Sequence, residues 1–127
     1  MSSNIKPGVV IFTGDHKRLA KFYEGMTGLT VSFADDQITV LDSATLELVI
    51  HSIKNEPAVS NPPRIREDGY IKPFFPVETL SEAREKAAAL GGQLRPQTAE
   101  WMGRGFRACE ATDPDGNVIQ FREEDIL

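Results

Sequence analysis

The sequence predicts an α+β fold in which two βαβββ modules form a cupped mixed sheet. Two observations support this prediction: an order of one helix among four strands occurs twice, and the two copies keep a nearly constant offset. The predicted helix starts, Asp15 and Thr79, lie 64 positions apart, and the glycines that end the helices, Gly28 and Gly91, lie 63 positions apart. We therefore expect one domain with a first module at 5–51, a linker at 52–69 and a second module at 70–127.

Local signals place one helix and four strands in the first module. Residues 9–13 are apolar and β-branched, which is typical of a strand. Asp15 is a favourable N-cap for the helix that follows, and Gly28 ends that helix after about Met26. The apolar residues of the helix recur every three or four positions and form one stripe: Leu19, Phe22, Tyr23 and Met26. Turn residues then separate three further strands, expected at 30–34, 37–41 and 45–50.

The second module repeats this order after a linker that contains three prolines and little periodicity. Its first strand is expected at 71–77, where two prolines remove hydrogen-bond donors and place part of the strand at a sheet edge. Thr79 and Glu82 form a capping box at the start of a helix over 79–90. The remaining strands are expected at 93–97, 106–112 and 117–122.

The composition excludes several classes of protein. Among the 127 residues there is a single cysteine, Cys109, which rules out an internal disulfide and a four-cysteine zinc site. The net charge is −5 and no run of Lys or Arg occurs, so we expect no binding to nucleic acid. No apolar run approaches the roughly 20 residues that span a bilayer, and the first residues lack the apolar region of a signal peptide. We therefore expect a cytoplasmic protein that does not contact membranes.

Each predicted module has a single helix, which covers only one face of its sheet. The other face must meet the other module, a second chain or a ligand. Because an exposed apolar face of that size is unusual in a monomer, we expect a homodimer.

Three motifs occur at corresponding places along the chain. The turn Asp113-Pro-Asp-Gly-Asn117 is followed by a strand, Phe22-Tyr23 stands seven residues after Asp15 and is followed by Gly28-Leu29, and Gly103-Arg104 precedes the last pair of strands. Together they resemble the DPDGN ending, the first-module pattern and the W-G-R stretch of the vicinal oxygen chelate superfamily, which holds glyoxalase I, bleomycin- and fosfomycin-resistance proteins and extradiol dioxygenases. The resemblance implies paired βαβββ modules, usually completed in a homodimer.

The superfamily is named for a metal ion that four side chains hold. Carried over to this sequence, the four positions fall on Gly8, Glu47, Lys72 and Gln120. Glu47 matches a ligand and Gln120 is a weak one, whereas Gly8 has no side chain and Lys72 carries a positive charge. We therefore expect no catalytic metal and no other cofactor.

Glu47 is the candidate functional carboxylate. Leu46, Leu48 and Ile50 share an apolar face that must lie under the helix, so Glu47 points toward the cup. It is either a functional group, with a catalytic role as one option, or the structural partner of a cation. We expect an ion pair between Glu47 and Lys72, either direct or bridged by water and completed by Gln120, where the metal of the relatives would lie. The other candidate ligand-binding residues are Phe74, Trp101 and Arg104, with Trp101 in a loop that either binds a ligand or covers the core.

Four other features are interpreted as structural. His51 is expected at the surface at the end of a strand, and His16 is expected to be solvated in the first turn of a helix. Cys109 lies in a predicted strand without a neighbouring base and is expected to be an inert core thiol. The G-x-G-x-x-A stretch at 103–108 precedes a strand rather than a helix, so it cannot receive a pyrophosphate at a helix N-terminus.

Two classes of function remain open. The first is a metal-independent protein that binds a small polar or aromatic ligand in the cup, as in the bleomycin-sequestering branch that the chain resembles. The second is a lyase, isomerase or dioxygenase of the same superfamily, with Glu47 as an acid–base group. The poor ligand set favours the first class, and the negative net charge suggests an acidic cup that prefers cationic or polar aromatic ligands.

Overall fold

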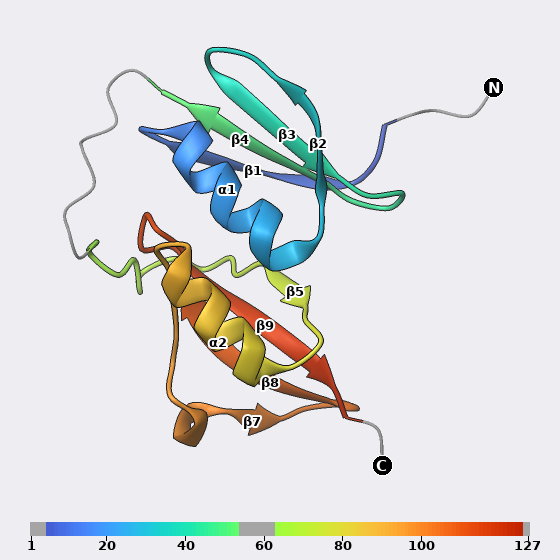
Figure 1. The fold of residues 1–127 in the computed structure, drawn as a ribbon, viewed down its shortest axis with the longest axis vertical. Helices are drawn as coiled ribbons and strands as arrows, with labels where there is room; N and C mark the ends of the chain where they lie inside the picture. The colour runs from blue at the N-terminus through green and yellow to red at the C-terminus, as the bar shows by residue number, and fades with distance from the viewer. Residues whose placement is uncertain (1–4, 54–62, 126–127) are drawn as a thin grey trace.

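The computed structural model of the chain, which describes residues 5–53 and 63–125, confirms two modules that each place one helix on a mixed sheet (Figure 1). The first module holds β1 (Gly8–Thr13), α1 (His16–Thr27), β2 (Thr30–Ala34), β3 (Ile38–Asp42) and β4 (Glu47–Ser52). The second holds β5 (Phe74–Pro76), α2 (Leu80–Ala89), β6 (Gln93–Leu94), a 3-10 turn η1 (Gln97–Ala99), β7 (Trp101–Met102), β8 (Phe106–Thr112) and β9 (Val118–Glu124).

In the first sheet the strand order is β1-β4-β3-β2, with β1 parallel to β4 and the other pairs antiparallel. The helix bounds follow the capping signals. The Asp15 side chain accepts a hydrogen bond from the backbone N–H of Arg18 at 3.3 Å, and Gly28 ends the helix at a positive φ of 74°. Such a φ favours glycine, because a Cβ would be strained there.

In the second sheet the order is β5-β9-β8-β6, and the short strand β7 pairs with β8 outside this path. Thr79 caps α2 by accepting a hydrogen bond from the backbone N–H of Glu82 at 3.1 Å, as predicted. The predicted strand 71–77 forms only over Phe74–Pro76, parallel to β9. The two prolines explain the shortening, because neither Pro73 nor Pro76 has an N–H to donate to a neighbouring strand.

The other differences from the predicted elements lie in the segment between α2 and β8. The expected strand 93–97 ends at Leu94, and β7 adds a strand, so the described residues form nine strands instead of eight. Trp101 therefore lies in a strand and not in a loop. Of the predicted linker, residues 54–62 lie outside the described residues, while Arg66 forms an isolated parallel bridge with Asn117. Neither helix of the described part is long and apolar enough to cross a bilayer.

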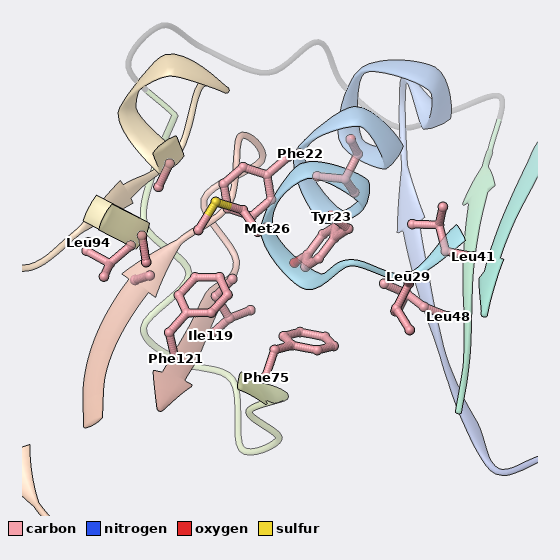
Figure 2. Close-up of a cluster of buried hydrophobic side chains, with 14 of the residues drawn as sticks. Phe22, Tyr23, Met26, Leu29, Leu41, Leu48, Phe75, Leu94, Ile119 and Phe121 are labelled. Atoms are coloured by element: carbon pink, nitrogen blue, oxygen red, sulfur yellow. The ribbon is translucent and has the colours of Figure 1, made fainter. Parts of the chain in front are cut away.

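A single apolar core joins the two modules, with α1 between the two sheets (Figure 2). The predicted stripe of this helix is buried, since Leu19, Phe22 and Tyr23 have no exposed surface. On one side they meet Leu41 and Leu48 of the first sheet, and on the other side they meet residues of the second sheet that include Phe75, Ile119 and Phe121. Burial of large apolar side chains on both sides of one helix stabilises the two modules as one unit.

Buried hydrogen bonds also join the modules, through the turn between β8 and β9. The Tyr23 hydroxyl of α1 donates to Oδ2 of Asp113 at 2.5 Å, and the Thr13 hydroxyl of β1 donates to Oδ2 of Asp115 at 2.6 Å. Burial raises the pKa of the Tyr23 hydroxyl, and the charges of Asp113 and Asp115 raise it further, so the hydroxyl stays protonated as the donor. The DPDGN turn thus ties the second module to the first.

Candidate functional site

A cavity of about 980 Å³ lies between β1 and the second sheet. Its wall comes from β1, from residues 65–69 and 71–73 ahead of β5, and from parts of α1, β6, β8 and β9. The charged side chains on this wall are balanced in sign: Arg66, Lys72 and Arg95 against Glu67, Asp68 and Glu110. The described part of the wall thus has no excess of acidic side chains, and the expectation of an acidic cup was wrong.

The first sheet contributes an apolar surface on the face opposite α1. The strand register aligns Val10, Val49, Val40 and Phe33 in one row across all four strands. Val10 and Phe12, which line the cavity, are 53% and 56% exposed. The side of the site formed by the first module is thus hydrophobic.

Lys72 provides the main polar contact of the cavity, and its partner differs from the predicted one. The Lys72 ammonium forms an ion pair with the carboxylate of Glu110 on β8, so the expected ion pair between Lys72 and Glu47 was wrong. Glu110 is directly opposite Gln120 in the register of β8 and β9, which brings it to the side of the sheet where Lys72 lies. The sequence indicates this orientation of Glu110, because its neighbours Cys109 and Ala111 are core residues and successive side chains of a strand point to opposite faces.

Glu47 points away from the core, as predicted, since its neighbours Leu48 and Ile50 are fully buried on the α1 side. It opens β4 opposite Gly8 of β1 and is half-buried. It does not line the cavity, however, so the prediction that it points toward the cup was wrong. The two modules therefore do not bring Glu47 and Lys72 together at a shared point.

The four positions that hold a metal in the resembling proteins do not fit a divalent ion here. A Cβ at Gly8 would overlap the backbone oxygen of Glu47, so no ligating side chain can be placed there without moving β1. Lys72 is held by Glu110, and Gln120 accepts a hydrogen bond from Arg122. Within 5–53 and 63–125, no group of three His, Cys, Asp or Glu side chains is arranged to hold a metal. A catalytic divalent site needs about three such ligands.

A cluster of arginine and aromatic side chains lies on the same face of the second sheet. We call it the arginine–aromatic cluster, and it consists of Phe74, Phe106, Gln120 and Arg122. The Cζ atom of Arg122 lies 3.7 Å from the ring centroid of Phe74 and 4.1 Å from that of Phe106. Its Nε–H donates to the side-chain oxygen of Gln120 at 2.5 Å.

Two further predicted site residues lie beside this cluster. Trp101 is 40% exposed and pairs with Ala108, which in turn is opposite Arg122, so the three share one row of the sheet. Arg104, in the turn before β8, has its Cζ 5.5 Å from the Phe106 ring. The structure thus brings four of the six predicted ligand-binding residues to one surface: Phe74, Trp101, Arg104 and Gln120. The sequence analysis missed Arg122 and Phe106 as site residues. Their signal was the alternation of side chains along each strand, which places both on the face opposite the core residues.

The two histidines differ from their predicted environments. His16 is buried, with Nδ1 2.8 Å from the Thr39 hydroxyl and Nε2 3.1 Å from the backbone oxygen of Asp36, so the expectation of a solvated side chain was wrong. The turn between β2 and β3 folds over the start of α1 and encloses the ring. His51 is half-buried and packs edge-on against Phe12, at 5.7 Å between ring centroids. Its Nδ1 is buried and has no hydrogen-bond partner among the described residues.

Cys109 is a buried core residue, as predicted. Burial raises the pKa of its thiol, although the Arg84 guanidinium at 3.7 Å opposes this shift. The thiol is therefore protonated near neutral pH, and it donates to the backbone oxygen of Arg95 at 3.4 Å. It has the environment of a structural residue.

Solved structures share this fold at low sequence identity. A glyoxalase/bleomycin resistance protein/dioxygenase family enzyme from Burkholderia phytofirmans PsJN is similar with a TM-score of 0.67 and 17% identity, over 92% of this chain and 96% of that chain. A glyoxalase-related enzyme from Fulvimarina pelagi has a TM-score of 0.67 and 21% identity, over 96% and 89% of the two chains. The fosfomycin resistance protein FosX from Listeria monocytogenes has a TM-score of 0.65 and 16% identity, over 97% and 94%. No curated protein matches this sequence.

The paired modules therefore share the fold of these solved structures. Residues 8–121 match the family model described as the glyoxalase-like domain. Because this match spans most of the chain, the protein belongs to the glyoxalase-like domain family.

Proposed function

We propose that the protein binds a small polar or aromatic molecule in the cavity between β1 and the second sheet, without a metal ion. The observation that carries this proposal is the cavity itself. Its volume of about 980 Å³ lies at the upper end of the range of small-molecule sites, and one of its sides is apolar while another holds the Lys72–Glu110 ion pair. Small-molecule sites combine apolar side chains with polar groups that orient the ligand, and this wall holds both.

Metal independence is supported by the donor set. Gly8 cannot carry a ligand, Lys72 is engaged by Glu110, and the remaining candidates, Glu47 and Gln120, are too few for a divalent ion. Catalysis by Glu47 is not favoured by the geometry, because this carboxylate is not on the cavity wall. These contacts support binding rather than the alternative of a lyase, isomerase or dioxygenase.

The experiment joins native mass spectrometry with metal analysis of protein purified without a chelator. We expect well below one equivalent of transition metal, a thermal midpoint that a chelator does not change, and a small molecule that adds to the protein mass. Stoichiometric Zn, Mn, Fe or Ni, lost on chelation together with ligand binding, would overturn the metal-independent function.

A pair of matched variants locates the binding. Val10→Trp fills the cavity from a residue that lines it and is 53% exposed, whereas Val31→Trp adds the same bulk at a 46% exposed residue outside the cavity. We expect the first variant to lose the bound molecule and the second to retain it, with similar thermal midpoints. Equal retention in both variants would exclude the cavity as the site.

We also propose that the protein is a homodimer. The apolar row of the first sheet extends beyond the cavity through Val49 and Val40 to Phe33, which is 53% exposed. A second chain would remove this surface from water. Analytical ultracentrifugation is expected to give about twice the 14.0 kDa of one chain at tens of micromolar. A single species of 14.0 kDa at that concentration would refute the dimer.

A further inference from the structure

The position of Arg122 follows from the strand register. On β9, Val118, Gln120 and Arg122 alternate with the core residues Ile119 and Phe121, so the first three lie on the face away from α2. Phe74 on β5 is opposite Gln120, and Phe106 on β8 is opposite Glu124. The Arg122 guanidinium therefore lies between two aromatic rings, Phe74 from β5 and Phe106 from β8, the strands on either side of β9 (Figure 1).

These contacts hold the guanidinium in place. Each ring lies within about 6 Å of Cζ, the range in which cation–π attraction acts, and the Nε–H is used by the Gln120 oxygen at 2.5 Å. An arginine side chain loses much rotational entropy when it is fixed. Here that loss occurs on folding, so a ligand that binds the guanidinium does not have to restrict it again.

The positive charge of Arg122 is not neutralised by the fold. Among residues 5–53 and 63–125, no carboxylate forms an ion pair with Arg122; Glu110 on the neighbouring strand is engaged by Lys72. Glu124, in the next row, is exposed. The hydrogen bond to Gln120 uses Nε and leaves the two terminal nitrogens, which together present the paired donors that bind two oxygens of a planar anion.

The neighbouring surface is aromatic. Phe74 is 53% exposed, and Trp101, in the row of Arg122, is 40% exposed. Exposed rings beside a fixed cation suit a ligand that carries a ring and an anionic group together. The cluster does not line the cavity but borders it, because Gln120 is directly opposite the cavity residue Glu110.

We propose that Arg122 binds the anionic group of the ligand at the border of the cavity, outside the cavity wall itself, and that the ligand class is an aromatic carboxylate. The carboxylate accepts hydrogen bonds from the terminal nitrogens of Arg122, and the ring packs against Phe74 and Trp101. This inference rests on the proposed small-molecule-binding function and assigns the chemical class of its ligand.

The test uses NMR titration of labelled protein with four related probes: benzoate, neutral benzamide, cationic benzamidine and ring-free acetate. Backbone amides of the cluster and the Arg122 Nε–H signal are followed. We expect saturable binding of benzoate with shifts at Arg122 and Trp101. Benzamide and benzamidine should bind at least about tenfold more weakly, because they lack the charge-assisted pair with Arg122. Acetate should also bind at least about tenfold more weakly, because it keeps this pair but lacks the ring that packs against Phe74 and Trp101. Equal binding of benzamide or benzamidine would overturn the assignment. Phenylphosphonate forms a separate arm, and tighter binding of it than of benzoate would overturn the carboxylate in favour of a phosphonate or phosphate.

Matched variants test the residue. Arg122→Met keeps the length of the side chain and is expected to weaken benzoate binding at least about tenfold. Arg107→Met is the control, because Arg107 lies on the same sheet but on the opposite face, beside Glu100. Unchanged benzoate affinity in Arg122→Met, or equal losses in both variants, would contradict the proposal. If Arg122→Met does not fold, Arg122→Lys carries the test, since lysine keeps the charge but lacks the planar pair of donors.

The failure of this inference is distinguishable from the failure of the proposed function. If neutral or cationic aromatic probes shift the signals of cavity residues such as Lys72 and Thr112, the cavity is a binding site and only the role of Arg122 is wrong. If no probe shifts either set of signals and the native mass spectrum shows no added molecule, the binding function itself is wrong.

Discussion

The hydrogen bond between Tyr23 and Asp113 joins the two modules, and its contribution to stability can be measured by removing the Tyr23 hydroxyl. Tyr23 has no exposed surface, and its hydroxyl donates to Oδ2 of Asp113, itself fully buried, at 2.5 Å. Tyr23→Phe removes this donor and leaves the ring in place. The carboxylate keeps three other donors: the backbone N–H groups of Asp115 and Asn117 on Oδ1, and the Asn117 side-chain amide on Oδ2. The variant is therefore expected to fold with a weaker contact between modules.

The magnitude follows from the charge and burial of the pair. A hydrogen bond to a charged group contributes about 1.5–3 kcal/mol, and we expect Tyr23→Phe to lower the free energy of unfolding by about 2 kcal/mol. The entropy of unfolding is about 2.1 cal/mol/K per residue, which for this chain length amounts to about 0.27 kcal/mol/K. The expected decrease in thermal midpoint is therefore about 7 °C.

The loss should also depend on pH. Burial raises the pKa of Asp113 above its usual value of 3.8, while the hydrogen bonds from Tyr23 and Asn117 oppose the rise. Because the pKa of Asp113 is higher in the folded state than in the unfolded state, protonation of this carboxyl stabilises the folded state. This stabilisation is fully present below about pH 3.8 and is lost as the pH rises through the folded-state pKa. Tyr23→Phe raises that pKa further, so the destabilisation is largest near neutral pH and smaller near about pH 4.

Scanning calorimetry of the wild type and Tyr23→Phe near neutral pH and near about pH 4 provides the measurement. Tyr70→Phe is the control, because Tyr70 is the only other tyrosine and its side chain is fully exposed; its effect should stay within about 0.5 kcal/mol. A loss of under 0.5 kcal/mol for Tyr23→Phe, or a loss that grows as the pH falls, would refute the reasoning.

Three further substitutions test separate contacts by thermal unfolding. Gly8→Ala should lower the free energy of unfolding by about 2 kcal/mol, because the new Cβ overlaps the backbone oxygen of Glu47. Gly69→Ala is the control and should change this free energy little, since its Cβ would be 3.9 Å from the nearest backbone oxygen; equal effects would contradict the close approach of β1 and β4. Lys72→Met should cost at most about 1 kcal/mol, because the ion pair with Glu110 is partly exposed, and a larger loss would show that the pair is a structural element. His16→Ala should cost about 2–3 kcal/mol by leaving the buried Thr39 hydroxyl without its partner, while His51→Ala should cost less; the reverse order would contradict the assigned environments.

The sequence by itself determined the module order, both helices and the face of each long strand. The helix bounds followed from Asp15, Gly28 and Thr79, because capping involves residues only a few positions apart. Alternation along β4, with Leu48 and Ile50 buried, assigned the orientation of Glu47 for the same local reason. The motifs then indicated the superfamily, which the family match confirms.

The tertiary structure decided which side chains meet. Lys72 pairs with Glu110 and not with Glu47, His16 is enclosed by the turn that follows β2, and the turn at Asp113 hydrogen-bonds with Tyr23 across 90 positions of sequence. Each of these contacts depends on how far two strands are offset and how one module sits on the other. Such distances are set by the packing of the whole core, and no local pattern of residues records them.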